Sequence, residues 1–320
     1  FANLDAVYYL VHAMGSSPDF AETDRRSASN TQRAAEAAGV SRLIYLGGLG
    51  DGEGLSHHLS SRHEVGSILA EGEVPVTELR AAVIIGSGSA SFEMLRHLVE
   101  VLPAMTCPRW VTRTQCQPIA IADVLRYLVD VLAVESTTGR ILEIGGPDVL
   151  TYQDMMHGYA ASAGLRKRII IPLPLLTPRL SSHWVNLVTP LPIGLARPLV
   201  DSLINDVVVT PTFDIGNYIG HRPMPFGEAV DKALLSVQDL AVSTSWMDSA
   251  QTSSPASPLP QDPSWAGGTV LQDVREVQSS AGAEALFATA AGIGGERGWY
   301  FGDWLWAIRG RIDKLLGGVG

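Results

Sequence analysis

Up to about residue 150, segments with the apolar pattern of buried strands alternate with segments that carry small or apolar residues at helical spacing. Helices of ten or more residues between strands require parallel pairing and right-handed crossovers, so the pattern predicts an α/β fold with a doubly wound parallel sheet. The expected strands are 5–12, 42–46, 77–85, 118–122 and 140–144. The expected helices are 23–38, 59–70, 91–102, 123–133 and 151–165, the first capped by Thr23 or Asp24 and ended by Gly39.

The alternation weakens after Thr151. Residues 169–200 are rich in Pro and Leu without clear periodicity, and residues 251–264 have the Ser- and Pro-rich composition of a linker. A strand at 268–277, a helix at 284–291 and a Trp- and Arg-rich stretch at 298–316 follow. We therefore expect a first domain at 1–250, a linker at 251–264 and the start of another domain at 265–320.

Composition excludes two classes of partner. The net charge of −10 argues against nucleic acid, whose phosphates bind clusters of Lys and Arg. No integral membrane span is expected, because the most apolar stretch, 184–204, is interrupted by Pro190, Pro192, Arg197 and Pro198.

Cysteine usage and the chain ends bear on location. Cys107 and Cys116 match no common metal or redox spacing and are expected to be reduced thiols in a cytoplasmic protein. No metal site is expected at His57, His63 and Glu64, which lack a matching ligand pattern. No signal peptide is seen, and a chain that opens on Phe1 and stops at Gly320 reads as a fragment cut at both ends.

Several strings together carry a resemblance to a known family. They are DAVYYLVHAM, NTQRAAEAAGVSRLIYLGGLG, LSSRHEVGSIL, VTELRAAVIIGSGS, QPIAIADVLRYLVDVL and EIGGPDVLTYQDM. Their order resembles atypical or extended short-chain dehydrogenases/reductases, and more narrowly the NmrA-like and epimerase-like NAD(P)-binding proteins. The string GGERGWYFGDWLWAIRGRIDKLLGGVG resembles the C-terminal DUF2867-type domain that some of them carry.

The resemblance implies the architecture. It implies a partial Rossmann-like sheet that lacks the family's first three strands and its glycine-rich pyrophosphate turn, followed by the start of an α+β, helix-grip-like domain. The cofactor implied is NAD or NADP. Gly292, Gly294 and Gly295 follow no strand and lack the spacing of a phosphate-binding turn.

The family's catalytic positions are all changed here. His58 stands at the position of the family's Tyr, Arg62 at that of the Lys four residues later, and Gly47 or Gly48 at that of the Ser. One reading makes His58 a proton shuttle and Arg62 a ligand of ribose or phosphate oxygens. The other, which we prefer, gives the pair no chemical role.

The cofactor cleft implied by the resemblance lies at strand ends. Its expected residues are Val11, His12, Gly47, Gly48, Arg62, Ala82 and Ile84. His12 ends a parallel strand, where doubly wound sheets bind ligands, although a His that caps a loop is the competing interpretation. The stretch 80–86 resembles the family's segment beside the nicotinamide, with Ala81 where Pro is usual.

The C-terminal aromatic residues have two interpretations. We expect the core of the second domain, or else the wall of an apolar ligand pocket, to contain Trp299, Tyr300, Trp304 and Trp306. The core is the preferred interpretation. The nearby arginines are balanced by acidic residues, which argues against nucleic-acid binding.

Three functions follow. The first is an NAD(P)-binding oxidoreductase or epimerase-like protein acting on a small molecule. The second is a non-catalytic NAD(P)H-binding regulator or assembly factor, suggested by the lost catalytic positions. The third is a carrier of an apolar ligand through the C-terminal domain.

Overall fold

The computed structural model describes residues 1, 4–13, 20–50, 54–173, 193–238, 278–293, 298–299 and 301–315. The chain forms two compact units, Phe1–Ser249 and Ala250–Gly320. The expected strand at 268–277 and the expected linker at 251–264 lie outside the described residues.

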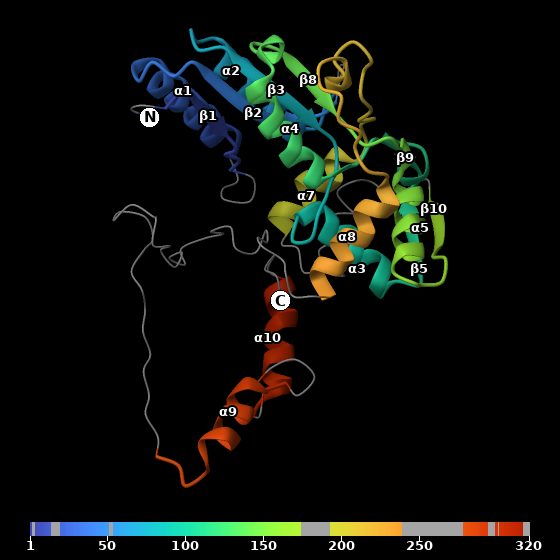
Figure 1. Ribbon diagram of the computed structural model, residues 1–320. Coiled ribbons are helices and arrows are strands. Elements are labelled where there is room, and N and C mark those ends of the chain that lie inside the picture. Colours follow the sequence, from blue (N-terminus) through green and yellow to red (C-terminus); the bar gives the residue numbers. More distant parts are fainter. Residues whose placement is uncertain are drawn as a thin grey trace. The chain divides into compact units, whose positions relative to one another are not determined.

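A four-stranded parallel sheet forms the centre of the first unit (Figure 1). Its strands, in spatial order, are β1 (Ala6–Tyr9), β2 (Arg42–Gly48), β3 (Val76–Ala81) and β8 (Ile141–Ile144). All three pairings are parallel. The carboxyl ends of the strands therefore meet at one edge of the sheet, and the prediction of an α/β fold with a parallel sheet is confirmed.

Alternate residues of β2 build the two core layers. Leu43 and Tyr45 pack in one cluster with residues of α1 (Phe20–Ala37) and α2 (His57–Ala70). Ile44 packs in another cluster with residues of α4 (Ile121–Ala133). This alternation follows from the two-residue period of a strand and places helices on both faces of the sheet.

A helical layer adjoins the carboxyl edge of the sheet. It contains α3 (Ala90–Val101), α5 (Tyr152–Ser162), α7 (Ile193–Ser202) and α8 (Phe226–Gln238), which contribute to the largest apolar cluster. Three short strand pairs accompany these helices: β4 (Ile84–Ile85) with β7 (Ile119–Ala120), β5 (Ala104–Pro108) with β10 (Ile169–Leu173), and β6 (Gln115–Cys116) with β9 (Leu150–Thr151). Single 3₁₀ turns lie at Arg109–Thr112, Glu135–Thr137 and Ile215–Asn217.

Two expected strands differ from the prediction. The run 77–85 breaks after Ala81, and its last two residues pair with β7 outside the main sheet. The strand expected at 118–122 shrinks to two residues. The start of α4 packs closely on the end of β4: a Cβ on Gly86 would lie 2.7 Å from Ile121, the first residue of α4.

The second unit has two described helices, α9 (Ala283–Ala291) and α10 (Asp303–Leu315). Trp299 and Trp306 stack on one another at a centroid distance of 5.1 Å, yet Trp299, Trp304 and Trp306 are 44–66% exposed. The described helices do not enclose these three side chains, and the choice between core and pocket wall stays a prediction. Tyr300 lies outside the described residues.

Within the described ranges, no helix combines the length and the apolar character needed to cross a membrane.

Candidate functional site

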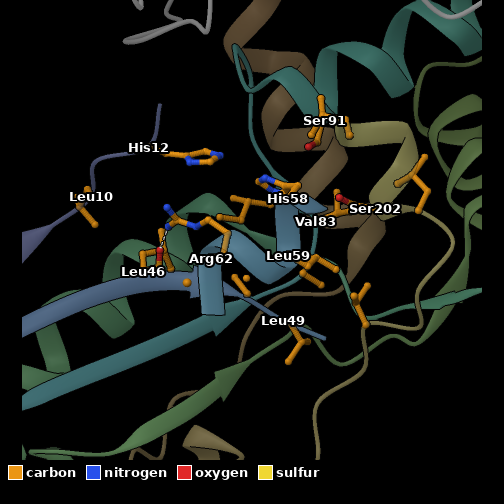
Figure 2. A pocket seen from close by; sticks show the side chains of 18 of the residues that line it. Leu10, His12, Leu46, Leu49, His58, Leu59, Arg62, Val83, Ser91 and Ser202 are labelled. Carbon is orange, nitrogen blue, oxygen red and sulfur yellow. Dashed lines mark hydrogen bonds between the residues drawn. The ribbon is translucent and has the colours of Figure 1, made fainter. Parts of the chain in front are cut away.

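A cavity of about 280 Å³ opens at the carboxyl ends of β1, β2 and β3 (Figure 2). One wall is formed by the strand ends and the residues just after them, including Leu10, Gly47 and Ala82. A second wall is the first half of α2. Side chains from α3, α5 and α7 complete the enclosure: Ser91, Tyr152, Leu199 and Ser202.

The structure brings most of the sequence-predicted site residues together at this cavity. Those that line it are His12, Gly47, Gly48, His58, Arg62, Ala82 and Ile84. Val11 is not among them: its side chain is 52% exposed, and its carbonyl oxygen accepts a hydrogen bond from Arg62 Nη1 at 3.3 Å.

Arg62 is a buried cation held by uncharged groups. Its guanidinium donates to the carbonyl oxygens of Val11 and Leu46 and lies over the ring of Tyr45, 4.9 Å from the ring centroid. Tyr45 Oη in turn donates to the carbonyl of Arg62 at 2.8 Å. Among the carboxylates that the structure describes, none forms an ion pair with Arg62. A buried guanidinium that forms no direct salt bridge is suited to bind an anionic or polyhydroxyl ligand.

His12 is held by a buried carboxylate. Its Nδ1 lies 2.9 Å from Oδ2 of Asp24, whose Oδ1 accepts the backbone N–H of Ala13 at 2.8 Å. Burial alone would raise the pKa of Asp24, but the hydrogen bonds from His12 and Ala13, with the nearby charges, lower it below its ordinary value. Asp24 is therefore ionised at neutral pH.

His58 lies beside His12, with 5.0 Å between the ring centroids. Burial, followed by the neighbouring His12 and Arg62, lowers the pKa of His58 to about 3. His58 is therefore neutral near pH 7, and its Nδ1 is buried without a hydrogen-bond partner in the described part of the chain.

The other two histidines of α2 do not join this group. His57 packs edge-on against Phe20, and His63 Nε2 lies 3.1 Å from the carbonyl oxygen of Gly48. Across the residues with a described position, no cluster of three His, Cys, Asp or Glu side chains has a metal-binding arrangement.

Close packing accounts for the glycines at the end of β2. A Cβ on Gly47 would lie 2.8 Å from Oε1 of Glu78, and one on Gly48 would lie 2.9 Å from Cδ2 of Leu59. A side chain at either position would require Glu78 or Leu59 to shift. The cavity thus lacks the hydroxyl that the family resemblance implies at this strand end.

Sequence reasoning missed the role of Asp24. It was expected as a helix cap, but α1 begins earlier, at Phe20, and Asp24 points into the core with 0% exposure. A signal was present, because Asp24 lies at helical spacing from Ala28 and Ala35, both also fully buried. A charged residue on the apolar face of a helix indicates a specific partner.

Three comparisons place these observations among known proteins. Residues 265–320 match the family model "Protein of unknown function (DUF2867)", which confirms the resemblance expected of the C-terminal string. No curated protein matches the chain.

Solved structures resemble the chain at low identity. An NADPH-dependent quinone oxidoreductase from Escherichia coli has a TM-score of 0.56 at 16% identity, over 73% of this chain and 77% of that one. A Citrobacter sp. triphenylmethane reductase complexed with NADP(H) has a TM-score of 0.55 at 17% identity, over 72% and 77%. A nucleoside-diphosphate-sugar epimerase from Staphylococcus aureus has a TM-score of 0.54 at 13% identity, over 72% and 77%.

These likenesses establish the class of fold. The first unit has the Rossmann-like fold seen in these NAD(P)-dependent epimerases and reductases, and residues 265–320 match the DUF2867 family model.

Proposed function

We propose that the cavity binds the nicotinamide end of NAD or NADP, and that the chain acts as an oxidoreductase or epimerase-like protein on a small molecule. The observation that carries this proposal is Arg62, a buried guanidinium at the strand ends that forms no salt bridge with a described carboxylate. Ligands of doubly wound sheets bind beyond the carboxyl ends of the strands, which is where Arg62 lies.

The cavity residues suit this end of the cofactor. The volume of about 280 Å³ is near the lower end of the roughly 300–1,000 Å³ of small-molecule sites. Leu49, Leu59 and Val83 offer apolar surface to a flat ring, while Arg62 would bind the ribose or phosphate oxygens. When bound, the nicotinamide gives or takes a hydride. The chain's own residues would orient it and exclude water.

Two of the similar structures support the cofactor assignment, since one is described as NADPH-dependent and the other was solved with NADP(H). Cytoplasmic location is part of the same proposal. It is supported by Cys107 and Cys116, which are free, buried thiols of the kind found in reducing compartments.

Fluorescence titration of the full chain with NADH and with NADPH tests the proposal. Arg62→Gln should weaken binding at least about tenfold, because a hydrogen bond to a charged group is worth about 1.5–3 kcal/mol. Arg42→Gln is the matched control: Arg42 is also buried and bonded to Thr77 and Thr137, but it does not line the cavity. Its loss should lower stability and leave affinity of the folded protein unchanged. No binding by the unaltered chain, or equal losses in both variants, would contradict the proposal.

A non-catalytic NAD(P)H-binding protein is the second candidate. Gly47 and Gly48 favour it, because neither supplies the hydroxyl of an active family member at this strand end, and the side chains of Glu78 and Leu59 pack closely against them. It predicts cofactor binding without turnover of any carbonyl or hydroxyl compound.

A further inference from the structure

Two buried aspartates of the first unit hold a histidine in the same way. Asp24 accepts one bond from the Ala13 N–H and one from His12 Nδ1. Asp123 accepts one from the Met224 N–H, at 2.9 Å, and binds Nε2 of His221 at 2.8 Å. The pairs differ in their surroundings, because His12 lines the cavity and His221 does not.

The pairing with Asp24 fixes which nitrogen of His12 carries the proton. The side chain of Asp24 is 1% exposed and ionised, so it accepts the proton of Nδ1. In the neutral imidazole, Nε2 is then an acceptor with a free lone pair. Nε2 is buried and has no hydrogen-bond partner in the part of the chain that the structure describes. A buried polar atom without a partner is costly, which indicates a ligand atom at this point.

We propose that His12, oriented by Asp24, is the residue that transfers a proton in the cavity, and that its substrates are small carbonyl or hydroxyl compounds. The proposal rests on the proposed function, because NADH or NADPH must supply the hydride. In the reducing direction the hydride adds to the carbonyl carbon and the C=O π bond breaks. Nε2 first takes a proton from water, so that both ring nitrogens carry one. The oxygen then takes the Nε2 proton, which gives a hydroxyl group and returns His12 to its neutral form. In oxidation, the free Nε2 accepts the hydroxyl proton as the hydride leaves the carbon.

The groups around His12 favour it over its neighbours in this role. They are Asp24 from α1, and His58 and Arg62 from α2, which Figure 2 shows beside the ring of His12. Burial and the neighbouring His12 and Arg62 lower the pKa of His58 to about 3, so its ring does not carry a proton on both nitrogens near neutral pH. Tyr152 also lines the cavity, but burial, together with its bond to Cys116, raises its pKa well above the ordinary value. His12 alone among these three is hydrogen-bonded to a carboxylate, which fixes the orientation of its ring.

Histidine tautomers in the full chain, measured by long-range ¹H–¹⁵N correlation NMR, test the orientation without any substrate. We expect His12 with Nδ1 protonated and Nε2 unprotonated at neutral pH. Asp24→Asn should alter this tautomer, while Asp123→Asn should alter only that of His221. A His12 protonated at Nε2, or one unaffected by Asp24→Asn, would overturn the inference.

Kinetics test the chemistry. In NADPH-driven reduction of an aldehyde, ketone and quinone panel, His12→Gln should lower kcat by about 100-fold or more. Asp24→Asn should lower kcat less and move its pH profile, which a merely structural loss would not do. Both variants should keep the NADPH affinity of the unaltered chain, and His221→Gln is the control with normal kcat. Full activity of His12→Gln, or an unaltered chain that binds NADPH and reduces no panel member, would overturn the inference. Absence of NADPH binding in the unaltered chain would instead contradict the proposed function, and the tautomer result would stand separately.

Discussion

At the scale of single residues, burial of His58 makes stability depend on pH. The unfolded chain binds a proton at His58 near its ordinary pKa of about 6.5, whereas the folded chain does so only near pH 3. The unfolded state therefore holds more protons between these values, so the stability is complete above pH 6.5 and falls as the pH drops through that window.

The charged and titratable groups that act on His58 are His12, Arg62, Asp24 and His57. In the His58→Gln variant the unfolding free energy should fall less steeply as the pH drops. One proton contributes a slope of at most about 1.4 kcal/mol per pH unit. Urea denaturation from neutral pH to about pH 4 measures it. The control is His57→Gln, at the exposed neighbouring position, which should keep the slope of the unaltered chain. Equal slopes in the unaltered chain and both variants would contradict the burial of His58.

The glycine at the position of the family's Ser gives a second prediction at this scale. Gly48→Ser should destabilise the first unit by about 1–3 kcal/mol, because its Cβ meets Leu59 and the core must shift. Gly220→Ser is the matched control, since no atom lies within 4 Å of a Cβ placed there. Thermal unfolding of both variants measures the difference. A stable Gly48→Ser protein would show that the strand end has room for a hydroxyl.

Sequence reasoning at this scale found residues whose position follows from strand and helix ends. His12 was located in this way, because the carboxyl ends of parallel strands meet at one edge. His58 and Arg62 came instead from the family resemblance, as the residues at its Tyr and Lys positions. The ion pair of His12 with Asp24 was not predicted. It depends on how α1 packs against the loop after β1, and that information is tertiary.

At the scale of elements, the start of α2 positions the site. Ser56 Oγ accepts the N–H of Leu59 at 3.2 Å and also lies 3.0 Å from Oγ of Ser202 on α7. Ser56→Ala should lower stability by about 1 kcal/mol and weaken NADPH binding, because α2 carries His58 and Arg62.

The control is Ser89→Ala, which removes an equivalent cap from α3, a 3.2 Å bond from the Phe92 N–H. It should cost similar stability and have little effect on NADPH affinity. Denaturation and cofactor titration of both variants measure this; equal losses of affinity would contradict it.

The elements that could be predicted are those with strong periodicity. β2, α2, α3 and β8 lie close to their expected bounds because apolar runs and terminating glycines mark them. The break between β3 and β4 was missed, since Ala82 and Val83 continue an apolar run. The pair β5 and β10 and the helix α8 were also missed. Short strands that pair over a long sequence separation leave little local pattern.

At the scale of the whole molecule, the domain division remains a prediction. The Ser- and Pro-rich composition of residues 251–264 predicts that limited proteolysis cuts there first and leaves a resistant fragment containing residues 1–238. Mass spectrometry of the fragments measures the cut. A first cut inside the four-stranded sheet would contradict the division.

The central claim is that the cavity at the carboxyl ends of β1, β2 and β3 holds the nicotinamide end of NAD or NADP. Hydrogen exchange of the full chain, followed by mass spectrometry with and without NADPH, tests it most directly. We predict slower exchange in peptides that cover residues 46–49, 57–62 and 81–85. Unchanged exchange in those peptides at saturating NADPH, or protection confined to residues 283–315, would contradict the claim.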